Sequence, residues 1–186
     1  DNTSSIAMSG SDPSGNSAAT EEWTGAGAPI GAWSTGGAMN TARNNAAGFG
    51  TQVAGITAGG GTPSATANVE SYDGTSWTEV NNLNTARFQD TGAGTATAGL
   101  VFGGGPGSGA TDATESWNGT NWTEVNNLTT ARRAAGGGGT QTSAIIFGGD
   151  PESGKTEIWN GTNWTEVGDL NTARQSLAGA AALNTA

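Results

Sequence analysis

The chain of 186 residues contains neither cysteine nor histidine. The absence of cysteine excludes disulfide bonds and thiolate chemistry, and with them any inference about redox compartment. The absence of histidine removes the commonest general base and the commonest protein ligand of zinc and copper. We therefore expect a protein that is not an enzyme and that carries no cofactor.

Basic residues are also scarce, since 6 Lys and Arg stand against 16 Asp and Glu and give a net charge of −10. Such a surface repels polyanions, which argues against nucleic acid and anionic membranes as partners. No apolar run approaches the ~20 residues of a membrane span, so membrane insertion is not expected. The chain begins at Asp1 without an initiator Met or a signal peptide, as expected of a mature product or of a part of a longer protein.

Large aliphatic residues are few as well. Leu, Ile, Val and Phe number 22 of 186, about 12%, a composition typical of disordered chains when it is combined with high net charge. Disordered chains also lack aromatic residues, whereas seven Trp recur here at regular places. Because each buried Trp removes ~150–250 Å² from water, we expect a folded protein. Its length predicts a single domain over residues 1–186.

One sequence segment recurs along the chain. Thr114–Arg132 reads TESWNGTNWTEVNNLTTAR, and Thr156–Arg174 repeats it almost unchanged. Val69–Arg87 is a less similar copy, and Glu21–Arg43 is a divergent copy that keeps two Trp and the final NTAR. The four closing arginines are separated by 44, 45 and 42 residues: Arg43, Arg87, Arg132 and Arg174. A fixed period in this range indicates a repeat architecture.

Each unit predicts four short strands. Glu115–Trp117 and Trp122–Val125 have strand character, and the Asn-Gly between them supplies the positive φ of a tight hairpin turn. Upstream, an apolar run closes on a glycine pair, as in Leu100–Gly104, and a segment of small residues such as Gly92–Ala98 follows each Arg. Four antiparallel strands repeated every ~45 residues are typical of a propeller blade.

The units resemble kelch repeats, in which an Arg, a small-residue strand, an apolar run closed by Gly-Gly, an aromatic residue and a Trp follow one another. Here these features are Arg132, Ile145–Gly149, Trp159 and Trp164. The resemblance covers essentially the whole chain and implies a β-propeller. More narrowly, the sequence motif GTxWTEVNxLNTAR is similar to repeats in structural proteins of phages, especially marine ones. That similarity implies a virion surface or another extracellular location.

The chain spans four repeats, so we predict an all-β fold, a four-bladed β-propeller. Asp1–Gly10 has no inner strand ahead of it, and the segment 175–186 supplies an inner strand with nothing after it. This closing strand is expected to pair with Ser4–Ser9 and to complete the ring. The small residues of the inner strands suit four blades that crowd around an axis. An excerpt from a larger ring is the alternative.

The connections between the second and third strands are long and unlike one another, and they open on the same face as the arginines. Variable loops on a rigid scaffold usually carry binding. The arginines could form a ring that holds a carboxylate or a sulfate. The alternative, which their recurrence favours, is that each pairs with a nearby carboxylate, such as Glu70, Glu115 or Glu157, or caps a loop carbonyl. The candidate ligand-binding residues are Arg43, Arg87, Arg132, Arg174, Asp12, Asp112 and Asp150.

Two further groups have both a functional and a structural interpretation. The Trp residues could stack on a sugar, but their phase fits packing between blades, so we expect Trp77, Trp122 and Trp164 to be buried. Asp12 and the sequence Asp150-Pro151-Glu152 lack the ligand spacing of a calcium loop, which favours solvated acidic loops.

These features favour a non-catalytic recognition or structural module on a virion or cell exterior, which binds a host-surface glycan or protein through loops on one face. One alternative is an architectural decoration or spacer that assembles with neighbouring structural subunits. A weaker one is a glycoside hydrolase with a carboxylate pair. Against it, acidic residues such as Glu79, Glu124 and Glu166 recur at surface positions of the same predicted strand.

Overall fold

The computed structural model describes residues 4–8, 10–24, 32–107 and 109–179. These residues form strands, turns and loops, and none of them belongs to a helix that could cross a membrane. They contain three four-stranded antiparallel sheets, one three-stranded sheet and a two-stranded hairpin. The all-β prediction is confirmed, and the four-stranded sheets fit propeller blades.

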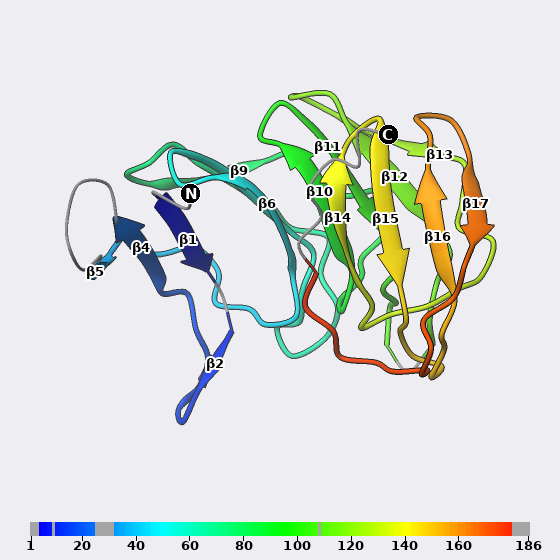
Figure 1. The fold of residues 1–186 in the computed structure, drawn as a ribbon. Helices are drawn as coiled ribbons and strands as arrows, with labels where there is room; N and C mark the ends of the chain where they lie inside the picture. The colour runs from blue at the N-terminus through cyan, green and yellow to red at the C-terminus, as the bar shows by residue number, and fades with distance from the viewer. Residues whose placement is uncertain (1–3, 9, 25–31, 108, 180–186) are drawn as a thin grey trace.

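Figure 1 shows the three-stranded sheet and the three four-stranded sheets following one another along the chain, and we refer to these four sheets as blades one to four. Blade one contains β1 (Ser4–Met8), β4 (Thr20–Thr24) and β5 (Ala32–Thr35). Blade two contains β6 (Ala47–Thr51), β7 (Ala54–Ala58), β8 (Val69–Tyr72) and β9 (Trp77–Val80). Blade three contains β10 (Thr91–Thr95), β11 (Ala98–Phe102), β12 (Thr114–Trp117) and β13 (Trp122–Val125). Blade four contains β14 (Gly136–Thr140), β15 (Ser143–Phe147), β16 (Thr156–Trp159) and β17 (Trp164–Val167).

Blade one differs from the others in the connection after β1. A small hairpin of β2 (Ser11–Asp12) and β3 (Gly15–Asn16) projects from this connection. The sequence did not predict it, because its short polar strands carry neither alternation nor β-branched residues. The connection from β4 to β5 consists of residues 25–31, which lie outside the described part of the chain.

The Asn-Gly turns join the two outer strands of a blade as predicted. In blade three, Trp117 and Trp122 face each other at the end of the ladder. The side chain of Asn118 accepts hydrogen bonds from the backbone N–H groups of Thr120 at 2.9 Å and Asn121 at 2.8 Å. Gly119 has a φ of +89°, a conformation that glycine adopts without strain. Local chemistry therefore specifies this turn.

The glycine pairs that follow the second strands have the predicted positive φ, at Gly103 (67°), Gly104 (82°), Gly148 (69°) and Gly149 (116°). Gly104 donates its N–H to the carbonyl oxygen of Arg132 at 2.9 Å. A Cβ on Gly103 would meet the same oxygen at 2.7 Å, closer than such contacts occur. The pair thus allows the backbone at the end of a blade to approach its second strand.

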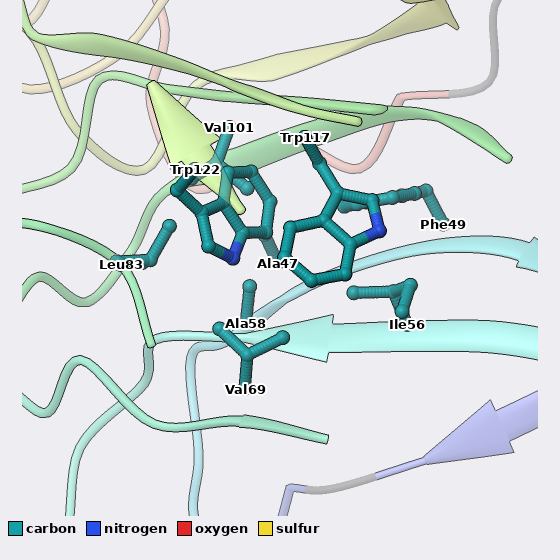
Figure 2. Close-up of a cluster of buried hydrophobic side chains, with 9 residues drawn as sticks. All are labelled: Ala47, Phe49, Ile56, Ala58, Val69, Leu83, Val101, Trp117 and Trp122. Atoms are coloured by element: carbon teal, nitrogen blue, oxygen red, sulfur yellow. The ribbon is translucent and has the colours of Figure 1, made fainter. Parts of the chain in front are cut away.

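The hydrophobic core lies between blades. Figure 2 shows one cluster, in which Trp117 and Trp122 of blade three lie beside residues of blade two, among them Phe49 and Ile56. The two indole rings are 5.1 Å apart between centroids. A second cluster of the same kind joins blades three and four. Because the apolar residues of one blade are covered by the next, neighbouring blades depend on each other for stability.

The predicted burial of the fourth-strand tryptophans is confirmed, since Trp77, Trp122 and Trp164 are only 5–6% exposed. Each indole N–H donates to the preceding blade. The acceptors are the hydroxyl of Thr20 at 2.9 Å, the carbonyl of Asn81 at 3.0 Å and the hydroxyl of Thr114 at 3.1 Å, in chain order. Burial with a satisfied N–H is the arrangement that Trp requires in a core.

The predicted closing strand falls largely on residues 180–186, which lie outside the described part of the chain, as does Ser9. Among the described residues, β1 pairs with β4. The start of the predicted closing strand lies beside blade four, where Ser176 donates its N–H to the carbonyl oxygen of Ala134 at 2.8 Å. Pairing of the closing strand with β1 therefore stays a prediction.

Candidate functional site

Three of the four candidate arginines lie inside the fold. The side chains of Arg43, Arg87 and Arg132 are 0–1% exposed, and each pairs with a buried glutamate of the following blade. These partners are Glu70, Glu115 and Glu157. For these three arginines the structure therefore shows pairing with glutamates, which was the alternative to a ligand site.

Each of these ion pairs is also hydrogen-bonded to the backbone. Arg87 Nη1 donates to the carbonyl oxygens of Gly103 at 3.3 Å and Ala113 at 2.9 Å. Glu115 accepts from the backbone N–H and the side-chain amide of Asn84, at 2.7 and 2.8 Å. Buried charges persist only where such partners satisfy them. These guanidinium groups thus fasten one blade to the next.

Arg174 is placed differently. Its side chain is exposed, and within the described residues it makes no ion pair. Its Nε donates to the carbonyl oxygen of Thr172 at 3.3 Å. Arg174 therefore lacks the buried ion pair that each of the other three arginines makes.

The candidate aspartates of the loops are not brought together either. Asp12 accepts a hydrogen bond from the N–H of Ser14 at 2.8 Å, and its hydrogen bonds with Ser14 lower its pKa. Asp150 pairs with Arg133 at 2.7 Å. Asp112 accepts from the backbone N–H of Leu128 at 2.9 Å through its own carbonyl oxygen. Among residues 4–8, 10–24, 32–107 and 109–179, no group of three acidic side chains is arranged to hold a metal ion.

One residue from each repeat lines a pocket that the sequence did not reveal. Two positions after each Arg stand Asn45, Gln89, Ala134 and Ser176, all in the left-handed conformation with φ between 51° and 57°. Together with the residues that follow them they line a pocket of about 370 Å³. We call it the axial pocket, because its walls come from the same position of all four repeats.

A chain of backbone hydrogen bonds holds the axial pocket together. Gln89 donates its N–H to the carbonyl oxygen of Asn45 at 2.7 Å, and Ala134 donates to that of Gln89 at 2.9 Å. Ser176 continues the series onto Ala134 at 2.8 Å. Left-handed backbone is costly for residues other than glycine and persists only where the surroundings impose it. Here these hydrogen bonds between repeats impose it.

Asp90 is the one ionisable residue among those that line the axial pocket. Both oxygens of its carboxyl group are buried, and neither makes a hydrogen bond of normal geometry among the described residues. Burial raises the pKa of Asp90 to about 8, against the opposing effects of the charge of Arg87 and of the nearby backbone N–H groups of Asp90 and Ala47. At neutral pH the group is therefore mainly the uncharged acid, which can donate a hydrogen bond.

The variable loops surround the axial pocket. Isolated bridges join the connection that enters each inner strand to the loop after the second strand, as between Phe88 and Gly105 or Arg133 and Asp150. Arg133 also donates to the carbonyl oxygen of Gly107 at 2.6 Å. The pocket and the loops thus form one face, which we call the loop face.

Asp90 and the axial pocket left only a weak signal in the sequence. The position of Asp90 holds Ala46, Ala135 and Leu177 in the other repeats, so a lone acid stands where the other repeats carry apolar residues. That contrast could have singled it out. The left-handed backbone at Gln89 and Ala134 could not have been predicted, because neither residue type favours it.

Fold and site together define an all-β protein of propeller-like blades with a pocket between the repeats. A comparison of the sequence with protein-family models finds no match, and a comparison with curated proteins finds none either. The resemblance to kelch repeats therefore rests on the residues of this chain.

Proposed function

We propose that this protein is a non-catalytic recognition module displayed on a virion or cell exterior. It binds a host-surface glycan or protein through the loop face. The observation that carries the proposal is a contrast within the repeats. Thr-Ala-Arg is unchanged in all four, whereas the residue two positions later differs each time and lines the axial pocket. Constant scaffold beside variable, accessible positions is the arrangement of binding surfaces built on rigid folds.

The chemistry of the pocket supports a polar, uncharged ligand group. Asn45 and Gln89 carry amides and Ser176 carries a hydroxyl, while the buried carboxyl group of Asp90 adds little charge at neutral pH. Ala46, Ala134, Ala135 and Leu177 supply apolar walls. A few hydrogen-bonding groups on an apolar lining suit a hydroxyl-rich sugar or the polar tip of a peptide. The net charge of −10 disfavours polyanionic partners.

The scaffold in this proposal is a closed ring of four kelch-like blades. Its support is that the equivalent positions of all four repeats line one pocket. A neighbouring pocket of about 170 Å³ is also lined by residues from each repeat, from Ala46 to Gly179, and most of them are small. Small side chains are what four inner strands around one axis require.

The test is a glycan array together with a panel of cells, probed with the fluorescently labelled chain. The discriminating variant is Gln89→Ala, which keeps the backbone because Ala134 already holds the same left-handed conformation. The matched control is Thr97→Ala, an exposed turn residue at the opposite ends of the strands. We expect Gln89→Ala to weaken binding about tenfold, the effect of one lost interaction of about 1.4 kcal/mol. Blank arrays and blank cells, or equal binding by both variants, would contradict the proposal.

A further inference from the structure

The three junctions between the four blades share one residue plan. The Arg that ends one blade pairs with a Glu on the third strand of the next, and the fourth-strand Trp of that next blade reaches back. Between blades three and four, Arg132 pairs with Glu157, and Trp164 donates to the hydroxyl of Thr114 at 3.1 Å. A junction therefore needs an Arg and a hydroxyl or carbonyl on one side, and a Glu and a Trp on the other.

Blade four ends in the donor half of such a junction. The carbonyl oxygen of Arg174 accepts from Gly149 at 2.9 Å, as that of Arg132 accepts from Gly104 at 2.9 Å. The Nε of Arg174 donates to the residue two positions earlier at 3.3 Å, as does the Nε of Arg132. The backbone of the fourth Arg is thus set as in the complete junctions, yet its side chain is exposed. Asn171 is the equivalent of Asn84, whose backbone N–H and side-chain amide donate to Glu115 at 2.7 and 2.8 Å.

Blade one presents the acceptor half. Glu21 faces Ala7 in the β1–β4 ladder, in the register in which Glu115 faces Val101 in blade three. The three equivalent glutamates are fully buried, whereas Glu21 is exposed. Trp33 of β5 is 50% exposed, while its equivalents Trp77, Trp122 and Trp164 are 5–6% exposed. Among the residues that the structure describes, the cationic half at one end of the row of blades and the anionic half at the other end therefore have no ion-pair partner.

We propose that blades four and one of the same chain form a fourth junction. Arg174 and Asn171 bind the carboxylate of Glu21, and the indole N–H of Trp33 donates to the hydroxyl of Thr156. Thr156 occupies in β16 the place that Thr20 and Thr114 occupy in their blades, and both of those accept from a Trp. The inference rests on the ring in the proposed function, although it does not depend on any ligand.

The shared pocket favours the same chain over a second copy. Ser176, which follows the fourth Arg, lines the axial pocket together with Asn45, which begins blade two. The end of blade four and the start of blade two thus already border the same pocket. Blade one is the unit between them in a ring of four, and it carries the complementary charge. The alternative is that each half-junction binds the complementary half of a second copy of the chain.

The first test is charge reversal. Arg174→Glu and Glu21→Arg should each lower the Tm by roughly 5–10 °C, since each leaves a charge of the junction without its partner. The double variant should recover most of the loss, because the pair is restored with its signs exchanged. Glu152→Arg makes the same change of charge at another exposed residue and should leave the Tm within about 2 °C. Single variants that melt like the unmodified chain would overturn the proposal.

The second test distinguishes closure within one chain from pairing with a second copy. Because the chain has no cysteine of its own, only introduced cysteines can be cross-linked. Gly168→Cys and Ala32→Cys are combined in one chain, which leaves the proposed Arg174–Glu21 pair intact, and the chain is treated with a short bismaleimide. Both residues are exposed, and their equivalents touch across the complete junctions, as Asn126 and Asn163 do at 2.8 Å. A cross-link inside a monomer is expected, seen as a shifted band that retains monomer mass and joins peptides 168 and 32. A cross-linked dimer would assign the site to a second copy and overturn closure within one chain, as would the absence of any cross-link. Glycan binding is measured separately, so the failure of one proposal is not mistaken for the failure of the other.

Discussion

Ala134 donates its backbone N–H to the carbonyl oxygen of Gln89 at 2.9 Å, across the boundary between two repeats. Neither residue is glycine, and both have positive φ, 51° and 57°. The same relationship links Gln89 to Asn45 and Ser176 to Ala134. The wall of the axial pocket is therefore built from backbone geometry, which leaves the side chains at these positions free to vary.

Removal of a tryptophan between blades should be costly. Trp122→Ala empties space in the cluster of Figure 2 and leaves the carbonyl oxygen of Asn81 without its donor. We expect a loss of about 3–5 kcal/mol in the free energy of unfolding, measured by urea denaturation. Thr123→Ala, at the exposed neighbouring position, should change stability by less than about 0.5 kcal/mol. An unchanged midpoint for Trp122→Ala would show that the cluster does not support the fold.

The buried pair of Arg87 and Glu115 should behave as a unit. Arg87→Met leaves Glu115 buried without its cation, which costs about 3–5 kcal/mol. The double variant with Glu115→Leu should be destabilised by much less than the sum of the two single changes, because no charge is left without a partner. A double-mutant cycle on the free energies of unfolding checks this expectation. Additive losses would mean that the two side chains act independently.

The glycine after the second strand should not tolerate a side chain. Gly103→Ala places a methyl group against the carbonyl oxygen of Arg132 on a backbone with a φ of 67°. We expect a loss of about 1–3 kcal/mol. Gly107 supplies the matched control, because a Cβ there meets nothing within 4 Å and its φ is not in the left-handed range. Equal thermal stability of the two alanine variants would remove the claim that Gly103 is required.

Asp90 should make stability depend on pH. Its pKa rises from 3.8 to about 8 on folding, so between these values the native state keeps a proton that the unfolded chain has released. Stability from this group is therefore complete at low pH and decreases as pH rises towards 8, by at most about 1.4 kcal/mol per pH unit. Asp90→Asn removes this dependence. The stability of the variant relative to the unmodified chain should therefore increase as the pH is raised from 5 to 8.

The measurement for Asp90 is the Tm of both chains across that range of pH. A constant difference between them would show that Asp90 does not keep its proton on folding. Asp12→Asn is a suitable control, because hydrogen bonds with Ser14 lower the pKa of this exposed carboxyl. Any effect of Asp12 should therefore appear at acidic pH, below the range in which Asp90 titrates.

Sequence predicted what local chemistry and periodicity determine. The Asn-Gly turns, the glycine pairs and the buried tryptophans such as Trp122 were all expected, because each has a residue type that its conformation requires. The partners of Arg43, Arg87 and Arg132 were anticipated as the alternative to a ligand site, since a residue repeated in every unit usually maintains the unit.

What sequence did not predict depends on contacts between repeats. Nothing local to Gln89 or Ala134 favours positive φ, and only the hydrogen bonds to the neighbouring repeat impose it. Asp90 was missed for a related reason, because its raised pKa follows from burial that only the assembled blades create. The β2–β3 hairpin has strands too short for any periodic signal.

The uniform junction has a consequence for how such a gene can change. In the three complete junctions, each unit receives an arginine from the unit before it and presents a glutamate to that same arginine. Excision of residues 88–132 would leave Arg87 facing Glu157 in place of Glu115, with both partners chemically unchanged. Recombination between the near-identical NTAR stretches could therefore exchange whole loops together with the pocket residues that follow them. The Arg and Glu that meet at these junctions would still form a pair.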